Sequence, residues 1–281
     1  MYSLLVAATV LFTVQFLFQQ QYRKSHGAGL EAMLNFSFCT GCIGCLLMLV
    51  LNGFHLRITA FAVGMAIAYS VSSLLNVYFA LKAFTTANLS VFSVFSMLGG
   101  MLLPFALGIA FYGEPLTVSK VLCCALIAGA VLLTIEKGER KSGGLRYCFG
   151  VFFFNGMSGV LSKIHQSNAL QATDSYSFMA LANLGNVLLC LALLLAVCKT
   201  HPQLKGREPL FVSGYAVCCA IGNLFCLIAL TVLPASVQYP IITGGVIVGA
   251  TIVSLLKKER PSRRNLAAAG VAFLASVLIA L

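Results

Sequence analysis

The longest uncharged stretch of the chain, residues 209–256, is PLFVSGYAVCCAIGNLFCLIALTVLPASVQYPIITGGVIVGATIVSLL. It is about twice as long as the roughly 20 apolar residues that cross a bilayer as one helix. A Leu-Pro-Ala-Ser segment at 233–236 interrupts it near its middle, where proline ends or kinks a helix. The stretch therefore predicts two membrane-spanning helices, at about 210–232 and 236–256.

The composition of the whole chain agrees with this stretch. Of its 281 residues, 60% are hydrophobic and 9% are charged, with a mean hydropathy of +0.97. An average soluble domain is about 25% charged, so the composition excludes a soluble globular protein. Charges and Gly or Pro breaks place ten expected helices at about 2–21, 31–52, 58–81, 86–112, 117–136, 146–166, 174–198, 210–232, 236–256 and 264–281.

A hydrophilic run at 136–144 divides these helices five and five, which predicts two halves, 1–141 and 142–281. Because five is odd, the second half would lie in the membrane upside down relative to the first. We expect an all-α integral membrane protein with ten transmembrane helices in two inverted five-helix repeats. The clearest matching landmarks are a Gly pair in the fourth helix and a Glu after it: Gly99-Gly100 with Glu114, and Gly244-Gly245 with Glu259.

Short motifs follow the fourth helix of each half. Residues 113–117 are Gly-Glu-Pro-Leu-Thr and lead into a helix of small residues that contains Gly129. Residues 258–262, Lys-Glu-Arg-Pro-Ser, stand at the matching place, with Lys258 where the motif has Gly. In these motifs and in helix count the chain resembles the ten-helix, EamA-type exporters of the drug/metabolite transporter superfamily. The resemblance implies a carrier of small molecules and indicates no particular substrate branch.

Polar side chains inside apolar helices are costly unless they face a cavity or a partner. In the third helix Tyr69, Ser72, Ser73 and Asn76 follow the i, i+3, i+4, i+7 spacing of one face. Packing is the alternative, since Ser, Thr and Asn also bond across helices and Ser bonds to its own helix. The residues that we expect to bind substrate are Gln15, Gln19, Tyr69, Asn76, Ser93, Asn155, Tyr215, Asn223, Gln238, Tyr239 and Thr243.

The seven acidic residues all lie near predicted helix ends, so we expect no carboxylate at the membrane midplane. Resemblance to small multidrug members of the superfamily would imply a Glu in the middle of the first helix, where this chain has Gln15 and Gln19. The sequence therefore favours a small neutral or zwitterionic metabolite, such as an amino acid or related compound, over proton-coupled export of cations. It leaves open whether Glu31 or Asp174, which open the second and seventh helices, reaches the cavity.

Several other side chains have structural interpretations at this stage. We expect Glu114 to have a structural role, since the dipole of the helix that follows it stabilises a carboxylate at its N-terminus. A gating contact is the alternative. Lys163 is expected to reach the membrane interface as an anchor. The four His residues, His26, His55, His165 and His201, are expected in or near loops, away from acids. The Cys39, Cys42 and Cys45 series is expected to pack helices as free thiols.

We thus expect a secondary membrane transporter that works by alternating access through a central polar cavity, with no enzyme activity, no metal and no cofactor. Its expected partners are a small-molecule substrate and the lipid bilayer, with no nucleic acid. The alternatives are a multidrug or quaternary-amine transporter, a membrane enzyme, and a lipid-handling protein with a laterally open cavity. A further alternative is an assembly subunit that pairs through Gly245 and Gly249, and a homodimer is left open.

The distribution of basic residues predicts the orientation of a multi-pass protein of the cell membrane. The loops after the odd-numbered helices and the adjoining helix ends hold 15 of the 18 Lys and Arg residues, against 3 on the opposite side. Because short loops rich in Lys and Arg stay in the cytoplasm, both termini are expected outside it.

Overall fold

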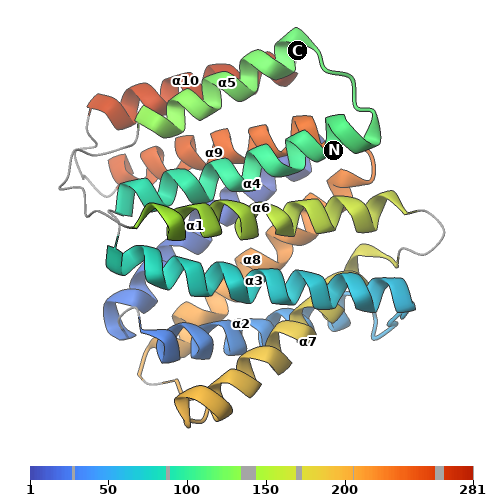
Figure 1. Cartoon of the computed structure of the whole chain (residues 1–281), viewed down its shortest axis with the longest axis vertical. Coiled ribbons are helices and arrows are strands. Elements are labelled where there is room, and N and C mark those ends of the chain that lie inside the picture. The colour runs from blue at the N-terminus through green and yellow to red at the C-terminus, as the bar shows by residue number, and fades with distance from the viewer. Residues whose placement is uncertain are drawn as a thin grey trace.

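The computed structural model describes residues 1–26, 29–86, 89–133, 144–168, 173–204, 206–256 and 263–280. All regular secondary structure in these ranges is helical (Figure 1). The elements are α1 (Tyr2–His26), α2 (Leu30–Leu51), α3 (Ala60–Thr86), α4 (Leu89–Tyr112), α5 (Val118–Leu133), α6 (Leu145–Ser167), α7 (Ser175–Leu193), the π-helical turn η1 (Leu194–Cys198), α8 (Glu208–Leu230), α9 (Ala235–Leu256) and α10 (Arg263–Ala280).

Seven of the described helices are long and apolar enough to cross a membrane: α1, α2, α3, α4, α7 continuing through η1, α8 and α9. The apolar stretches of α5 and α10 are shorter, and α6 carries Arg146, Lys163 and His165 along its length. The chain is therefore a multi-pass membrane protein by the length and composition of its helices.

The helix boundaries follow the sequence pattern with a few differences. The predicted break before Pro234 is confirmed, since α8 ends at Leu230 and α9 begins at Ala235. The first helix continues five residues past the predicted end at Gln21, to His26, because charged residues do not by themselves end a helix. A π-helical turn at the end of α7 had no signal in the sequence pattern.

The main helix contacts join elements that are far apart in the chain. The helix α1 packs against α8 and α9, while α6 packs against α3 and α4. Around them α2 contacts α7 and α8, α3 contacts α7, α4 contacts α9, and α5 contacts α10. Figure 1 shows α5 and α10 side by side at one edge of the bundle, in agreement with these contacts.

The α4–α6 and α1–α9 contacts are close because glycine forms one side of each. A Cβ atom on Gly99 of α4 would collide with the Phe152 backbone of α6. A Cβ atom on Gly245 of α9 would lie 2.6 Å from the Thr9 side chain of α1, and Gly249 stands against Thr13 in the same way. The Gly245–Gly249 face therefore packs against α1 inside the chain, and it is not the free pairing face that the assembly-subunit alternative requires.

The connections fall at two ends of the bundle. The helix ends that flank the α1–α2, α3–α4, α5–α6, α7–α8 and α9–α10 connections lie at one end (Figure 1). In the sequence, these connections and the adjoining helix turns hold 15 of the 18 Lys and Arg residues, so we call this end the basic end. The opposite end carries the remaining connections and both chain termini (Figure 1). We call it the Glu114 end, after the carboxylate in the α4–α5 connection.

The glycine contact between α4 and α6 gives a test of this packing. We expect Gly99→Ala to lower the thermal stability of the detergent-solubilised protein by about 1–3 kcal/mol, because overpacking displaces α6. The matched control is Gly129→Ala in α5, where a Cβ would meet nothing within 4 Å. The control should melt at or slightly above the wild-type temperature, because Ala favours helix more than Gly. Equal melting temperatures for the two variants would contradict the close α4–α6 approach.

Candidate functional site

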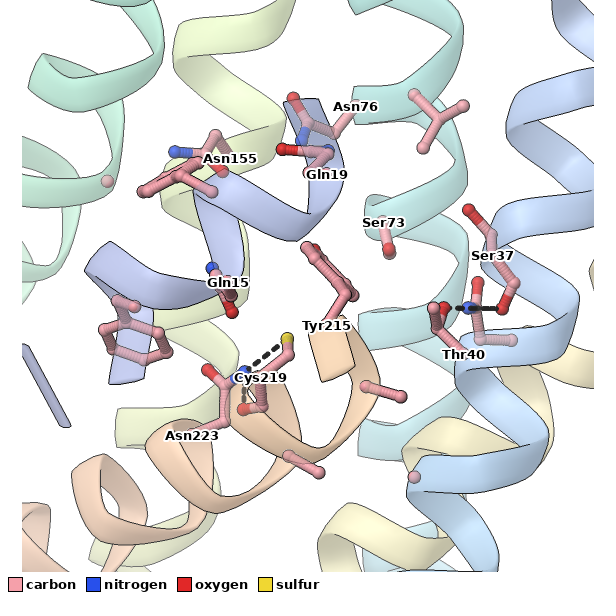
Figure 2. A pocket seen from close by; sticks show the side chains of 18 of the residues that line it. Gln15, Gln19, Ser37, Thr40, Ser73, Asn76, Asn155, Tyr215, Cys219 and Asn223 are labelled. Atoms are coloured by element: carbon pink, nitrogen blue, oxygen red, sulfur yellow. Dashed lines mark hydrogen bonds between the residues drawn. The ribbon is translucent and has the colours of Figure 1, made fainter. Parts of the chain in front are cut away.

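A cavity of about 630 Å³ lies inside the bundle, within the usual size range of small-molecule sites. Its lining comes from α1, α2, α3, α4, α6, α7, α8 and α9, and therefore from both sides of the 134–143 connection. Figure 2 shows polar side chains from α1, α2, α3, α6 and α8 gathered around it. Among the described residues, α5 and α10 supply none of the lining.

Most of the residues predicted to bind substrate lie on the wall of this cavity. Their contact with a substrate stays a prediction, but they come from five helices, α1, α3, α6, α8 and α9, and converge on one space. They are Gln15, Gln19, Tyr69, Asn76, Asn155, Tyr215, Asn223, Tyr239 and Thr243.

One of the predicted site residues, Gln238, is not on the wall. Gln238 is fully buried away from the cavity, and its Nε2 donates a hydrogen bond to the Cys226 carbonyl oxygen at 3.0 Å. The reason is helical geometry: one residue on from Gln238, Tyr239 points about 100° away and reaches the cavity. The side chain of Ser93 lies outside the described residues. Ser72, on the predicted face of α3, instead donates to the Phe154 carbonyl oxygen of α6 at 3.1 Å.

The helix α2 supplies part of the wall that the sequence prediction did not include. Ser37, Thr40, Gly41 and Gly44 line the cavity with the i, i+3, i+4, i+7 spacing of one helical face. That spacing was visible in the sequence, but small residues are also typical of helix packing. Asn186 of α7 reaches the same region and donates to the Ser37 carbonyl oxygen at 3.4 Å.

The amide side chains of the wall differ in their hydrogen bonding. Asn155 Nδ2 donates to the Ser96 carbonyl oxygen at 2.7 Å, and Asn223 Nδ2 donates to the Cys219 carbonyl oxygen at 2.9 Å. By contrast, Gln15 Oε1 and Asn76 Oδ1 are buried and have no partner among the described residues. A buried acceptor without a donor is costly, so these two amides would gain from a donor group that arrives with a ligand.

The cavity wall is electrically neutral. Its described lining contains amide, hydroxyl, thiol, aromatic and aliphatic side chains, and no Asp, Glu, Lys or Arg. Glu31 is exposed in the first turn of α2 and Asp174 accepts a hydrogen bond from the Ser177 backbone N–H at 2.8 Å. Neither carboxylate is part of the described cavity wall. The sequence had left open whether Glu31 or Asp174 reaches the cavity.

Aromatic rings cover a large part of the wall toward the basic end. Tyr22 and Phe36 lie with ring centroids 4.7 Å apart, and Phe36 meets Tyr215 edge-on, also at 4.7 Å. Phe12 and Phe16 of α1 add two further rings to the wall. Such faces attract both apolar groups and cations.

A second chamber of about 330 Å³ continues from the cavity toward the Glu114 end. It shares Tyr69, Asn155 and Tyr239 with the larger space, and Tyr239 donates a hydrogen bond to the Gly159 carbonyl oxygen at 3.1 Å. Its own wall includes Ser158, Ser162, Cys226 and Leu230. Because the two spaces share wall residues they adjoin each other, and we call them together the polar path.

A group of buried polar atoms lies beyond this chamber. It consists of the side chains of Glu114, Lys163 and Ser236 and the backbone N–H groups of Ala235 and Ser236, and we call it the Glu114 cluster. The Glu114 carboxylate accepts hydrogen bonds from the backbone N–H groups of Ala235 and Ser236, both at 2.9 Å, and from the Ser236 hydroxyl at 2.5 Å. It therefore caps the N-terminus of α9, where a negative charge is favoured. The prediction that it serves the helix following it in sequence, α5, is wrong, because the α4–α5 turn directs it across the bundle.

Lys163 completes the cluster. Its Nζ lies 3.1 Å from Glu114 Oε1, the two side chains are 11% and 7% exposed, and the ammonium stands 5.5 Å from the centre of the Tyr112 ring. The prediction that Lys163 reaches the membrane interface is therefore wrong, because a buried carboxylate neutralises its charge inside the bundle. Burial alone would raise the pKa of the Glu114 carboxyl, but the Ser236, Ala235 and Lys163 hydrogen bonds together hold it below its ordinary value.

His165 lies in the last turn of α6, near a connection as predicted, but its burial was not indicated by the sequence. It is fully buried at the end of α6 and stacks on Phe178 of α7 at a centroid distance of 4.0 Å, with Phe61 of α3 on a parallel plane at 6.0 Å. The Thr173 backbone N–H donates to its Nε2 at 3.3 Å. This ring packs α6 against α3 and α7 at the Glu114 end.

No group of three or more His, Cys, Asp and Glu side chains among the described residues could hold a metal ion. Cys39, Cys42 and Cys45 of α2 are free thiols. The described part of the chain thus presents the cavity and its polar path as the candidate site.

Comparisons with known proteins show the fold alone. No family model matches the chain, and no curated protein matches it. Among solved structures 28 chains match. One of these crystal structures aligns with 100% of this chain and 98% of its own at a TM-score of 0.77, with 15% sequence identity. At that identity the likeness establishes a shared arrangement of helices and no shared function.

The Glu114 cluster predicts how stability depends on pH. Because the pKa of Glu114 is lower in the folded protein than in the unfolded chain, its contribution is present above the ordinary carboxyl pKa and is lost as the pH falls. We expect the melting temperature of the wild type to drop more steeply than that of Glu114→Gln between about pH 5 and pH 3. Glu31→Gln removes an exposed carboxylate as the matched control. If both variants follow the wild type, Glu114 makes no such contribution.

Proposed function

We propose that the protein is a secondary membrane transporter that moves a small neutral or zwitterionic metabolite, such as an amino acid or related compound, by alternating access. The observation that carries the proposal is the neutral polar cavity inside an apolar multi-pass bundle. Polar groups in membrane helices are retained where they line a substrate path, and eight helices contribute to this one. A charged solute would meet no side chain of opposite charge on the described wall.

Helix packing supports two inverted five-helix repeats. If each helix is exchanged for the one five places away, the α1–α8 contact becomes α6–α3, and α4–α6 becomes α9–α1; both are present. The contacts α2–α7, α4–α9 and α5–α10 each map onto themselves. Such pairing is expected of two equivalent halves related by a two-fold axis in the membrane plane. In this proposal α5, α6 and α10 also span the membrane, which gives ten spans.

The extent of the described cavity wall supports the carrier mechanism. The cavity wall extends to Tyr22, Met33 and Ala80, within the terminal turns of α1, α2 and α3 at the basic end. At the other end the polar path stops beneath the Glu114 cluster. Alternating access requires a central site that communicates with one side at a time, and in our proposal the present structure is the state in which that side is the basic end.

The aromatic wall favours a second candidate, a transporter of quaternary amines. Trimethylammonium groups bind on aromatic faces without any need for a carboxylate. Tyr22, Phe36 and Tyr215 supply such faces around one part of the cavity. The partnerless oxygens of Gln15 and Asn76 favour the first candidate, because a quaternary amine has no N–H to donate to them.

A transport assay separates these candidates. Purified protein in proteoliposomes is offered radiolabelled neutral amino acids, betaines, quaternary amines and nucleobases, with empty liposomes as the control. We expect saturable uptake of one zwitterionic class without chemical change of the solute. Accumulation of quaternary amines alone would support the second candidate. Chemical turnover, or no uptake of any solute, would contradict the proposal.

The Asn76 amide gives a sharper test of the same site. We expect Asn76→Leu to reduce uptake at least about tenfold while the protein stays folded, because it removes a hydrogen-bonding group and keeps α3 apolar. Asn155→Leu should act in the same way, through loss of a second amide on the wall. The control is Thr251→Val, since the Thr251 hydroxyl donates to its own helix at Ile247, outside the cavity wall. Normal uptake by the Asn76 and Asn155 variants would place the substrate elsewhere.

The proposed orientation in the cell membrane has both termini outside the cytoplasm and the basic end inside it. Cysteine-free chains that carry a single Cys, either in place of Ser142 or appended to the C-terminus, are labelled on intact cells with an impermeant thiol reagent. We expect labelling at the C-terminus only. Labelling at position 142 only would reverse the orientation.

A further inference from the structure

The polar path ends at the Glu114 cluster, where side chains from three separate parts of the fold meet. Glu114 comes from the α4–α5 connection, Lys163 from α6, and Ala235 and Ser236 from the start of α9. The wall of the second chamber reaches residues near the cluster in the chain: Ser162 precedes Lys163, and Leu230 is the last residue of α8, the helix before Ala235.

We propose that the Glu114 cluster is the closed gate of the transport path. The inference rests on the proposed function, and it assigns the present structure to the state that is open at the basic end and closed at the Glu114 end. Glu114 is the central residue of the gate, and Lys163 and the α9 N-terminus are the groups that it holds together.

The local sequence places this carboxylate. Gly113 has a φ of +60°, a backbone conformation that favours glycine, and it turns the chain back beside α4 after Tyr112. The Glu114 backbone N–H then donates to the Gly108 carbonyl oxygen at 3.1 Å. A Cβ atom on Gly108 would lie 2.6 Å from the Glu114 carboxylate, so glycine at 108 also makes room for it. Gly108 and Gly113 together therefore position the Glu114 carboxylate at the N-terminus of α9.

The chemistry of the cluster suits a gate with two stable states. In the closed state one carboxylate satisfies two backbone N–H groups, one hydroxyl and one ammonium. These are the groups that water would otherwise have to satisfy at an exposed helix N-terminus. If Glu114 moved away, an intermediate without water would leave all of them buried and unpaired. The cluster is therefore favoured when fully closed or when fully hydrated, and partial opening is disfavoured.

The gate also joins elements that must separate for substrate to pass. Glu114 follows α4, which packs against both α6 and α9, and the cluster ties these three helices at one end. Tyr239, one turn into α9, donates to Gly159 of α6 and lies between the two chambers. Movement of the α9 N-terminus away from α6 would break both contacts together and open the second chamber to the Glu114 end.

Accessibility of Cys226 tests the gate without any transport assay. Cys226 lines the second chamber, so we use chains in which it is the only cysteine, reconstituted in sealed vesicles and exposed to a small impermeant thiol reagent. Separate chains with a single Cys at His55 or at His201, exposed residues at the Glu114 end and the basic end, identify the side of addition. With Glu114 and Lys163 intact, we expect labelling of Cys226 from the basic end only.

Loss of the cluster should open the second side. We expect Glu114→Gln to raise labelling of Cys226 from the Glu114 end about tenfold, because an amide offers one acceptor oxygen and no charge to four donors. Lys163→Met should give a smaller increase, since Glu114 would still cap α9. The matched control is Glu208→Gln, which removes a carboxylate of similar burial, 6% exposed, from the first turn of α8 at the basic end. That control should label like the wild type.

Two outcomes overturn the gate. One is wild-type labelling from the Glu114 end in both Glu114→Gln and Lys163→Met, in protein that melts cooperatively. The other is labelling of Cys226 from the Glu114 end while the cluster is intact. If the gate behaves as expected but no solute is transported by the wild type, the proposed function fails and the gate assignment stands.

Discussion

A polar group buried in an apolar bundle has to find a partner, and this constraint organises the molecule. In the hydrocarbon region no water is available to hydrogen-bond to amides, hydroxyls or charges. The described side chains meet the constraint in two ways. At the Glu114 end one carboxylate collects four donors, and in the interior neutral side chains converge on a shared cavity. The proposed binding site and the proposed gate are therefore two results of the same restriction.

The sequence predicted the cavity wall well where one helical face carried large polar residues. Asn76, Asn155 and Asn223 are bulky amides inside apolar spans, and all three line the cavity. The sequence could not decide which of Gln238 and Tyr239 faces the cavity, because both are polar and they are adjacent. Only the rotation of α9 in the bundle, which turns Tyr239 to the cavity and buries Gln238, separates them. The α2 face was missed because serine, threonine and glycine are equally typical of close helix packing.

The Glu114 cluster was hidden from sequence reasoning for a different reason. Glu114 is separated from Lys163 by all of α5, the connection after it and most of α6, and from Ser236 by more than a third of the chain. A charge near a helix end predicts solvent or interface, unless a partner of opposite sign is known to face it. Only the packing of α4 against α6 and α9 supplies that partner. The cluster pairs one carboxylate with one ammonium, so it adds no net charge next to the neutral cavity wall.

The central claim, that the chain alternates between states open at opposite ends, is tested most directly by distances between spin labels in lipid nanodiscs. One pair of labels at His55 and Leu116 reports on the Glu114 end, and a second pair at Leu145 and His201 reports on the basic end; all four side chains are exposed. The account predicts two distance populations for each pair, with substrate changing both pairs in opposite directions. A single unchanging distance at both ends, or simultaneous lengthening at both, would contradict it.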